Sequence, residues 1–249
     1  MIELRNISKS FDGRQILSDV SSTFEKGNIN LVIGGSGSGK TVMMKCMVGL
    51  EEVDQGAILY DGQRFSGLDK KGRKPFRQKI GMVFQGGALF DSLNVEQNVM
   101  FPLNMFTDMS LEEKKERVDF CLRRVNLPSA LKLMPSELSG GMKKRVAIAR
   151  AIAPSPSYLF CDEPNSGLDP RTSIVIDNLI KEITEEFSIT TIVNTHDMNS
   201  VLEIGDKILF LYQGKKWWEG GVDDILRTDN KELNDFIFAS KLAKGIKRV

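Results

Sequence analysis

A run of eight residues has the types and the spacing needed to bind a phosphate group. It matches the phosphate-loop pattern G-x-x-x-x-G-K-[ST] at every fixed position, and it reads Gly34, Gly35, Ser36, Gly37, Ser38, Gly39, Lys40 and Thr41. Glycines let the backbone wrap closely around an anion, so that several N–H groups face it. Lys40 would reach the β- and γ-phosphates of a nucleotide, and Thr41 would hold Mg²⁺. A glycine- and serine-rich turn has a similar composition, but so complete a match arises by chance in roughly one chain per hundred of this length.

Two acidic residues follow an apolar segment in the second half of the chain. Residues 158–161 are apolar, and Asp162 and Glu163 come directly after them. Hydrolysis of a nucleotide that carries Mg²⁺ needs such a pair at the end of a buried strand. Asp162 can reach the metal through a water molecule, and Glu163 is placed to polarise the attacking water as a general base. Considered alone, the pair is explained equally well by a strand followed by an acidic turn.

Ser139, Gly140 and Gly141 form a second candidate anion site, ahead of a segment that we expect to be a helix over 142–153. A serine and two glycines at a helix N-terminus leave N–H groups free for an anion. One γ-phosphate is not easily served by this site and by the phosphate loop of the same subunit. We therefore expect the second site to serve a partner subunit's nucleotide, in a head-to-tail homodimer with two ATP molecules between the protomers.

Two more side chains follow predicted strands and can act on the same nucleotide. His196 is the only histidine of the chain and comes after the predicted strand 190–193. A lone histidine is more often structural, but ligands of open α/β sheets bind at the carboxyl ends of strands. His196 can therefore hydrogen-bond the γ-phosphate and orient the water. Gln85 follows the predicted strand 80–84; its amide can ligate Mg²⁺ while ATP is bound and can transmit the nucleotide state to the helices that follow.

The elements that must position these residues follow an α/β pattern. Apolar runs predict buried strands at 29–33, 57–60, 80–84, 158–161 and 190–193. An apolar stripe predicts a helix between the last two strands, through Ile176, Ile180, Ile183 and Phe187. The periodicity is helical from about 93 to 153, which we interpret as a helical insertion into a parallel-sheet nucleotide domain. We expect one domain over 1–249, with its core and a β subdomain in 1–92 and 154–249.

Composition and charge limit the class of protein. The chain has 249 residues, of which 41% are hydrophobic, enough for a substantial core. Its net charge of +1 gives no reason to expect a nucleic-acid partner. Three widely spaced cysteines, Cys46, Cys121 and Cys161, predict free buried thiols in a reducing compartment. No uncharged apolar run approaches about 18 residues, so we expect a soluble cytosolic protein that can still dock on a membrane protein.

Several surface features allow more than one interpretation. Residues 69–74 are basic and are interpreted as a solvated loop rather than as a contact for lipid or nucleotide. Ala88, Leu89 and Phe90 are either core residues or, if exposed, a docking surface beside Gln85.

The last part of the chain is also ambiguous. Trp217 and Trp218 are expected to pack within a hairpin over 207–218 rather than to form a ligand cage. Residues 232–249 are expected to form a short helix with a basic tail, which packs on its own subunit or reaches a partner.

The order of these motifs resembles that of the ATPase subunits of ABC transporters, over essentially the whole chain. The motifs are residues 34–41, Gln85, 138–142, 158–163, 166–169 and His196. The resemblance implies an α/β P-loop NTPase with a RecA-like parallel-sheet core, an antiparallel β subdomain and an inserted α-helical subdomain. It also implies that Phe11 stacks on adenine, that Ser139, Gly140 and Gly141 contact the partner's γ-phosphate, and that Asp169 lies in a loop crossing the dimer interface. The stretch after Gln85 would receive a helix of a membrane-embedded permease.

Two longer stretches, 85–95 and 133–142, resemble the ATPase of Mla-type phospholipid transporters of Gram-negative envelopes. These systems combine a permease with an MCE-domain lipid-binding protein, which implies a peripheral place on the cytoplasmic face of the inner membrane. Met142 stands where glutamine is usual in the wider family but fits this subfamily; its thioether cannot donate as an amide can. The phospholipid cargo depends on this resemblance alone.

Other interpretations stay open at this point. Another transporter of the same superfamily, such as a lipoprotein-release or amino-acid system, has the same motifs. A non-transport ATPase that regulates cell-wall hydrolases through membrane partners is a second alternative. A DNA-associated ATPase of the superfamily fits less well, because the chain has neither a coiled-coil insertion nor a strongly basic face.

Overall fold

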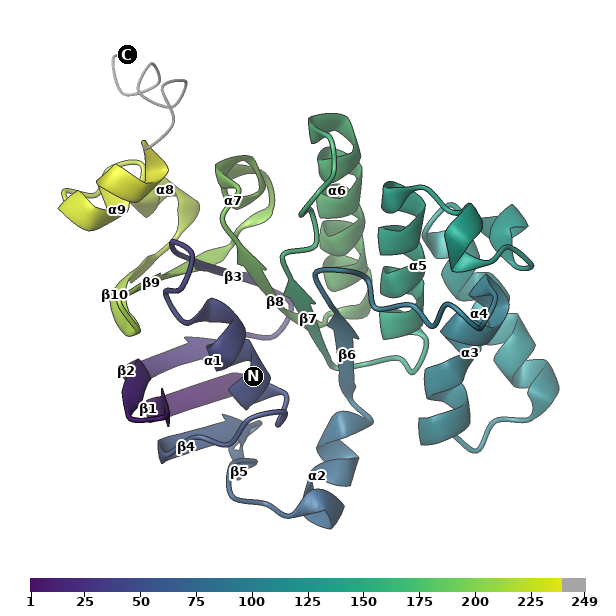
Figure 1. The fold of residues 1–249 in the computed structure, drawn as a ribbon, viewed down its shortest axis with the longest axis horizontal. Coiled ribbons are helices and arrows are strands. Elements are labelled where there is room, and N and C mark those ends of the chain that lie inside the picture. Colours follow the sequence, from purple (N-terminus) through teal and green to yellow (C-terminus); the bar gives the residue numbers. More distant parts are fainter. Residues whose placement is uncertain (239–249) are drawn as a thin grey trace.

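Two β-sheets and the helices packed on them make up residues 1–238, the part of the chain that the computed structural model describes (Figure 1). The larger sheet has the strand order β10-β9-β3-β8-β7-β6. Its strands are β3 (Ile29–Ile33), β6 (Ile80–Val83), β7 (Tyr158–Asp162), β8 (Thr190–Thr195), β9 (Lys207–Tyr212) and β10 (Lys215–Gly220). Neighbouring strands from β9 to β6 are parallel, whereas β10 pairs antiparallel with β9 and confirms the predicted hairpin.

Successive side chains of the larger sheet face two different hydrophobic cores. Leu159 and Cys161 of β7 belong to the core under the helices α5 (Gly140–Ile152) and α6 (Pro170–Phe187), whereas Phe160 belongs to the core beneath the smaller sheet. This alternation is the period of two that a strand imposes. Because both faces are covered, every residue of β7 and β8 is buried, and the strand ends are held in fixed positions.

The smaller sheet is antiparallel, with the order β2-β1-β4-β5, and forms the predicted β subdomain. Its strands are β1 (Ile2–Phe11), β2 (Arg14–Phe24), β4 (Gln55–Tyr60) and β5 (Gln63–Arg64). Leu17 and Val20 of β2 share a core with Met43 and Met47 of α1 (Lys40–Met47). The sheet therefore holds the helix that follows the phosphate loop.

Three helices form the predicted helical region, seen beyond β6 in Figure 1: α3 (Val95–Phe106), α4 (Leu111–Arg124) and α5. Asn94 and Ser110 begin α3 and α4 with reciprocal capping boxes, in which side chain and backbone satisfy each other's free N–H groups. Ser139 caps α5, which begins two residues earlier than predicted, so that Gly140 is already its first residue. Residues 125–139 between α4 and α5 contain two short 3₁₀ turns, at Pro128–Ala130 and Pro135–Glu137.

Two helices connect strands of the larger sheet: α6 lies between β7 and β8, and α7 (Met198–Ile204) lies between β8 and β9. Ile176, Ile180 and Ile183 are fully buried and confirm the predicted stripe of α6, although Phe187 at its end is 37% exposed. All three cysteines are free and buried, as predicted.

The interpretation of residues 69–74 as a loop is wrong, because the structure has the helix α2 (Lys70–Arg77) there. Asp69 caps it by accepting a hydrogen bond from the Gly72 N–H at 2.8 Å. The basic composition, with Gly72 and Pro75, favoured a loop on local propensity. Tertiary contacts of Phe76, whose ring lies 5.4 Å from that of Phe65, decide in favour of a helix.

The chain ends, within the described range, with α8 (Val222–Ile225) and α9 (Lys231–Ile237). Trp218 packs against the main core and Trp217 is 43% exposed, with its indole N–H donating to Glu232 at 3.1 Å, so the two rings serve packing as expected. The helix predicted at 232–249 is confirmed as α9, and its basic tail lies outside the described residues. Among residues 1–238, no helix is long and apolar enough to span a bilayer.

Candidate functional site

The candidate groups from four strands meet at one edge of the larger sheet. The order β3-β8-β7-β6 is parallel throughout, so the carboxyl ends of these strands lie together. The phosphate loop follows β3 and His196 follows β8. Asp162 ends β7, Glu163 comes directly after it, and Gln85 comes shortly after β6. This edge is where open α/β sheets bind their ligands.

The phosphate loop has the tight backbone that its glycines predict. Gly34 has φ +151°, and a Cβ there would lie 2.3 Å from the Leu211 carbonyl oxygen. Gly39 has φ +105°, and a Cβ would lie 2.8 Å from Leu17. The Ser38 hydroxyl is buried within this loop without a hydrogen-bond partner. A buried unpaired hydroxyl is costly, and a phosphate oxygen is the acceptor that would satisfy it, so the loop fits the phosphate group of a nucleotide.

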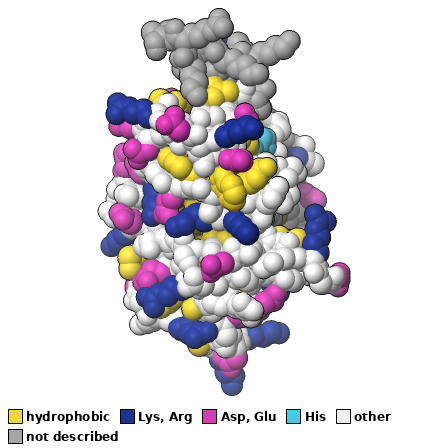
Figure 2. All heavy atoms as spheres, turned by 90° about the vertical axis from the view of Figure 1, so that its left-hand side faces the viewer, with side chains coloured by type: hydrophobic (Ala, Val, Ile, Leu, Met, Phe, Trp, Pro, Cys, Tyr) yellow, Lys and Arg dark blue, Asp and Glu magenta, His cyan; other side chains and the backbone are white. Residues whose placement is uncertain are grey.

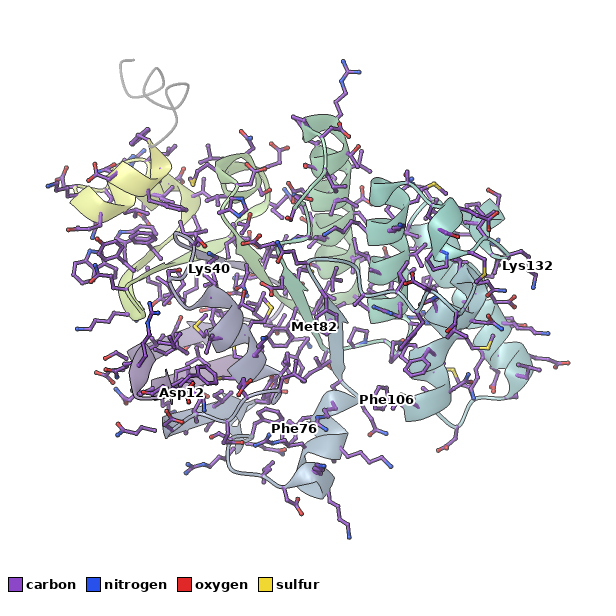
Figure 3. All side chains as sticks on the ribbon, viewed as in Figure 1. Asp12, Lys40, Phe76, Met82, Phe106 and Lys132 are labelled. Atoms are coloured by element: carbon purple, nitrogen blue, oxygen red, sulfur yellow. The ribbon has the colours of Figure 1, made fainter. Side chains whose placement is uncertain are left out.

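Lys40 lies across the loop and is only 6% exposed. Its ammonium donates to the carbonyl oxygens of Gly34 at 2.8 Å and Gly35 at 3.2 Å (Figure 3 labels Lys40). Burial lowers the pKa of Lys40, while the nearby carboxylates of Glu163 and Asp162 partly oppose this effect. A buried cation whose hydrogen bonds go to neutral carbonyls would gain strongly from an incoming phosphate.

Thr41 and Asp162 supply the oxygen atoms that Mg²⁺ prefers. The Thr41 hydroxyl donates to Oδ1 of Asp162 at 3.3 Å, and the buried Asn194 amide donates to the same oxygen at 2.8 Å. Residues 1–238 contain no cluster of three or more His, Cys, Asp or Glu side chains fit for a metal. The donor set therefore fits Mg²⁺ only together with phosphate oxygens, which is how proteins usually hold this ion.

Glu163 lies at the centre of a second group of contacts. Its carboxylate contacts Nδ1 of His196 at 3.3 Å and accepts a hydrogen bond from the Gln85 amide at 3.2 Å. The same amide donates to the Ser166 hydroxyl at 3.2 Å. Glu163 has φ +47°, a left-handed conformation that is uncommon outside glycine and that turns the chain sharply after β7. The structure thus brings together three of the predicted groups.

Lys144 of α5 is a residue that the motif-based analysis missed. It is 6% exposed, and its ammonium donates to the Gln85 carbonyl and, at 3.5 Å, to the Glu163 carbonyl. Burial lowers its pKa, while Cys161 and Glu163 oppose this effect. The Lys144 ammonium therefore connects α5 to the segment that contains Gln85 and to the segment that contains Glu163.

Ser139, Gly140 and Gly141 lie at the exposed N-terminus of α5, on the other side of β6 from the phosphate loop in Figure 1. The Ser139 hydroxyl accepts a hydrogen bond from the Met142 N–H at 3.3 Å. A Cβ at Gly141 would lie 2.7 Å from the Thr172 methyl group. The structure does not bring this site to the phosphate loop of its own chain.

Phe11 and Asp169 also lie apart from the cluster. Phe11 ends β1, is 38% exposed, and has the Lys9 ammonium 5.0 Å from its ring centre. Asp169 caps α6 by accepting from the N–H groups of Arg171 and Thr172. Hydrogen bonds from Thr172 hold the pKa of the Asp169 carboxyl below its usual value.

Sequence reasoning also missed Asn194, and it gave no role of its own to Ser166, although residues 166–169 are one of the motifs. Asn194 is an amide side chain inside the fully buried strand β8, and Ser166 follows Glu163 by three positions. A polar residue within a fully buried strand is a usable signal, because such a group needs a partner. Lys144 carried no comparable signal, since lysine near a helix start reads as solvent-exposed.

The fold and this site define a P-loop ATPase of the ATP-binding cassette class. Residues 17–166 match the family described as ABC transporter, and the chain belongs to that family. A bacterial ABC transporter cassette, MJ0796, solved as a dimer, superposes with a TM-score of 0.82 at 33% identity, covering 89% of this chain and 99% of that one. The same cassette bound to ADP and Pi, in a post-hydrolysis state, gives 0.83 at 33% identity and the same coverage.

Named relatives are longer than this chain. The methionine import ATP-binding protein MetN of Clostridium acetobutylicum is 35% identical over 237 residues, which covers 95% of this chain and 74% of that protein. MetN of Campylobacter jejuni is 36% identical over 253 residues, covering 95% of this chain and 75% of that protein.

Proposed function

We propose that this chain is the ATP-hydrolysing subunit of an ABC transporter that moves phospholipids between the membranes of a cell envelope. It acts as a homodimer on the cytoplasmic face of the inner membrane, held there by a permease. The single observation that carries the ATPase part is the contact of Glu163 with both His196 and Gln85, beside the phosphate loop.

ATP binds with its β- and γ-phosphates in the loop of residues 34–41. Lys40 exchanges its two carbonyl contacts for phosphate oxygens, and the unpaired Ser38 hydroxyl gains an acceptor. Thr41, Asp162 and Gln85 would hold Mg²⁺, which would supply positive charge against the phosphates. Phe11, exposed at the end of β1, stacks on the adenine.

Glu163 acts as the general base for hydrolysis. Its carboxylate takes a proton from the attacking water while the water's oxygen bonds to the γ-phosphorus and the bond to the β-phosphate oxygen breaks. His196, 3.3 Å from that carboxylate, donates to the γ-phosphate and keeps the water in line. Gln85 reports whether the γ-phosphate is present, because its amide shares Glu163 as a partner.

A second copy of the chain completes each site. Ser139, Gly140 and Gly141 of one copy contact the γ-phosphate bound by the other, and Asp169 lies near the crossing of the two copies. The exposure of Ser139 and Gly140 and the dimeric arrangement of the related MJ0796 cassette support this. ATP therefore closes the dimer, and loss of the γ-phosphate reopens it.

The permease docks on the surface formed by Phe90 and Phe101, which we call the docking surface. Both side chains are exposed, at 41% and 37%, and their rings are 4.6 Å apart. Leu89 instead packs against the core. Within residues 88–90, the core interpretation therefore applies to Leu89 and the docking-surface interpretation to Phe90. Large exposed apolar side chains beside a nucleotide-sensing loop favour a partner.

Two cargoes are supported by different observations. The resemblance of residues 85–95 and 133–142 to Mla-type ATPases supports phospholipid, and with it an MCE-domain lipid-binding partner. The names of the MetN relatives, at 35% and 36% identity, support an amino-acid importer instead. The phospholipid proposal is preferred because methionine at position 142, where glutamine is usual in the wider family, fits the Mla-type subfamily.

The two cargoes are separated by isolating the assembly from its native membrane in a mild detergent, with mass spectrometry of its proteins and lipids. We expect a permease, an MCE-domain protein and bound phospholipid. A permease without an MCE-domain protein, whose ATPase activity rises with methionine, would contradict the phospholipid proposal and leave the ATPase mechanism intact. Recovery of the chain alone would contradict the transport proposal as a whole.

A further inference from the structure

Residues 70–79, which we call the basic segment, carry charge that the proposed mechanism does not use. The segment holds six basic side chains and no acidic one: Lys70, Lys71, Arg73, Lys74, Arg77 and Lys79. The whole chain has 34 basic and 33 acidic residues, so the residues outside the segment hold 28 basic against 33 acidic. The positive charge of an otherwise acidic chain is therefore concentrated here.

The basic segment divides into an anchored and a free side. Arg73 and Arg77 each donate to the Gly49 carbonyl at 3.3 Å, and Arg73 also pairs with Glu52. Lys70, Lys71 and Lys74 are exposed, and none of them forms an ion pair within residues 1–238. In Figure 2, basic side chains stand at the lower end of the molecule, the end at which Figure 1 places α2, with some acidic ones among them.

The free lysines oppose the stability of their own helix. The first turn of α2 contains no acidic residue, and Lys70 and Lys71 lie at the end where the helix dipole is positive. Lys70 and Lys74 are like charges four residues apart, which also repel. Local rules are usually broken where a function outside the helix requires it.

Exposed apolar side chains lie on the segments that α2 contacts. The Gln78 amide donates to the Phe106 carbonyl at 3.3 Å and joins the end of α2 to the end of α3, where Figure 3 labels Phe106. Met105 there is 57% exposed, and Leu111 at the start of α4 is 60% exposed. Leu50, next to the carbonyl that both arginines bind, is 58% exposed.

We propose that α2 and the adjoining ends of α3 and α4 contact the anionic headgroups of a phospholipid membrane. Lysines near a bilayer are attracted by acidic lipids, and protruding apolar side chains enter the headgroup region. That this region faces the membrane rests on the proposed function, in which the permease docks on Phe90 and Phe101. Phe101 belongs to α3, and Met105 lies one turn further along the same helix. A surface continuous with the docking surface of a permease faces the lipid around it.

The test is binding of the full chain to vesicles, measured by co-sedimentation. One set is phosphatidylcholine only, and the other contains about 30 mol% phosphatidylglycerol. We expect binding to the anionic vesicles alone, weakening as salt rises from about 0.05 M to about 0.3 M. Reversing three charges with Lys70→Glu, Lys71→Glu and Lys74→Glu should lower the partition coefficient by about 100-fold or more.

A matched control reverses three exposed lysines on other elements, Lys26→Glu, Lys181→Glu and Lys231→Glu, with the same change in net charge. It should retain most of the binding. Equal loss in both triple variants, or equal binding to both sets of vesicles, would overturn the proposal, because the contact would then not be specific to α2. Basal ATPase activity, unchanged in both variants, verifies folding.

A double variant tests the apolar part. Met105→Gln with Leu111→Gln should weaken binding several-fold while leaving its salt dependence unchanged. Vesicle binding needs neither the permease nor its cargo, so a failed isolation of the transporter leaves this result valid. If the α2 variant instead loses the permease in detergent but still binds vesicles, the partner is an acidic protein segment and the membrane proposal is wrong.

Discussion

The two candidate phosphate-binding regions differ in how complete each is within one chain. Lys40 is buried, and Glu163 contacts one group that follows β8 and one that follows β6, so the contacts of the strand-end site all form within one chain. Ser139 and Gly140 are exposed, and the Ser139 hydroxyl contacts only the backbone of its own helix. We therefore propose that the first region holds a nucleotide within one chain, whereas the second is a half-site that a second copy completes.

Lys144 is the physical connection between these two regions. It lies in the first turns of α5, and it donates to carbonyls on both sides of the strand-end site. If the partner's nucleotide displaces α5, as the proposed mechanism requires, we expect Lys144 to carry the displacement to the backbone of Gln85 and Glu163. The comparison therefore predicts different effects of substitutions in the two regions. Substitutions in the strand-end site should lower turnover or ATP affinity, whereas substitutions at Ser139–Gly141 should weaken dimerisation.

The largest effect is expected from Glu163→Gln. Removing a general base lowers turnover by about 100- to 10,000-fold, while an amide of the same shape still offers one oxygen to the Gln85 amide. ATP binding should persist, and the closed dimer should accumulate with ATP, as size-exclusion chromatography would reveal. Turnover close to that of the unmodified chain would remove Glu163 from the role of base.

Lys40→Ala is expected to weaken ATP binding by about 100-fold, because it removes a charge-assisted contact from a desolvated site. Equilibrium binding of a fluorescent ATP analogue measures this directly. Lys45→Ala, an exposed lysine of the same helix, is the matched control and should bind normally. Unchanged affinity in Lys40→Ala would show that the loop does not hold phosphate in the way proposed.

The strand-end site could be predicted from the sequence because its positions follow from chain order and strand ends. Apolar runs located β3, β7 and β8, and parallel pairing then placed Glu163 near His196 without any knowledge of side-chain geometry. Where the structure differs from the prediction, contacts between elements distant in the sequence determine the local structure. Neither the anchoring of α2 through Phe76 and Arg77 nor the burial of Lys144 has a signature in local composition.

Ser139→Ala tests the half-site. Dimerisation in ATP should weaken by about tenfold, because one donor to the partner's γ-phosphate is lost, whereas ATP affinity of the monomer should not change. The helix loses its cap, which costs about 1 kcal/mol of stability. Ser110→Ala removes the equivalent cap of α4 and separates that structural effect from dimerisation. Equal dimerisation in the two variants would mean that the half-site contributes nothing to closure.

The smallest effect is expected from Lys144, which acts by positioning other groups. Lys144→Met removes the ammonium that donates to the Gln85 and Glu163 carbonyls, although the Glu163 carbonyl keeps the Ser166 N–H at 3.1 Å. We expect about a fivefold fall in kcat with little change in KM. Lys144→Arg should restore most of the activity.

The pH profile at saturating ATP distinguishes this role from simple packing. Because burial lowers the pKa of Lys144, its ammonium loses a proton as pH rises through a value below that of a free lysine, and turnover should fall with it. The bound phosphates keep Lys40 charged over the same range. Arginine does not deprotonate, so the alkaline fall should disappear in Lys144→Arg. A fall that persists in this variant would assign it to another group and reduce Lys144 to a packing residue between the two regions.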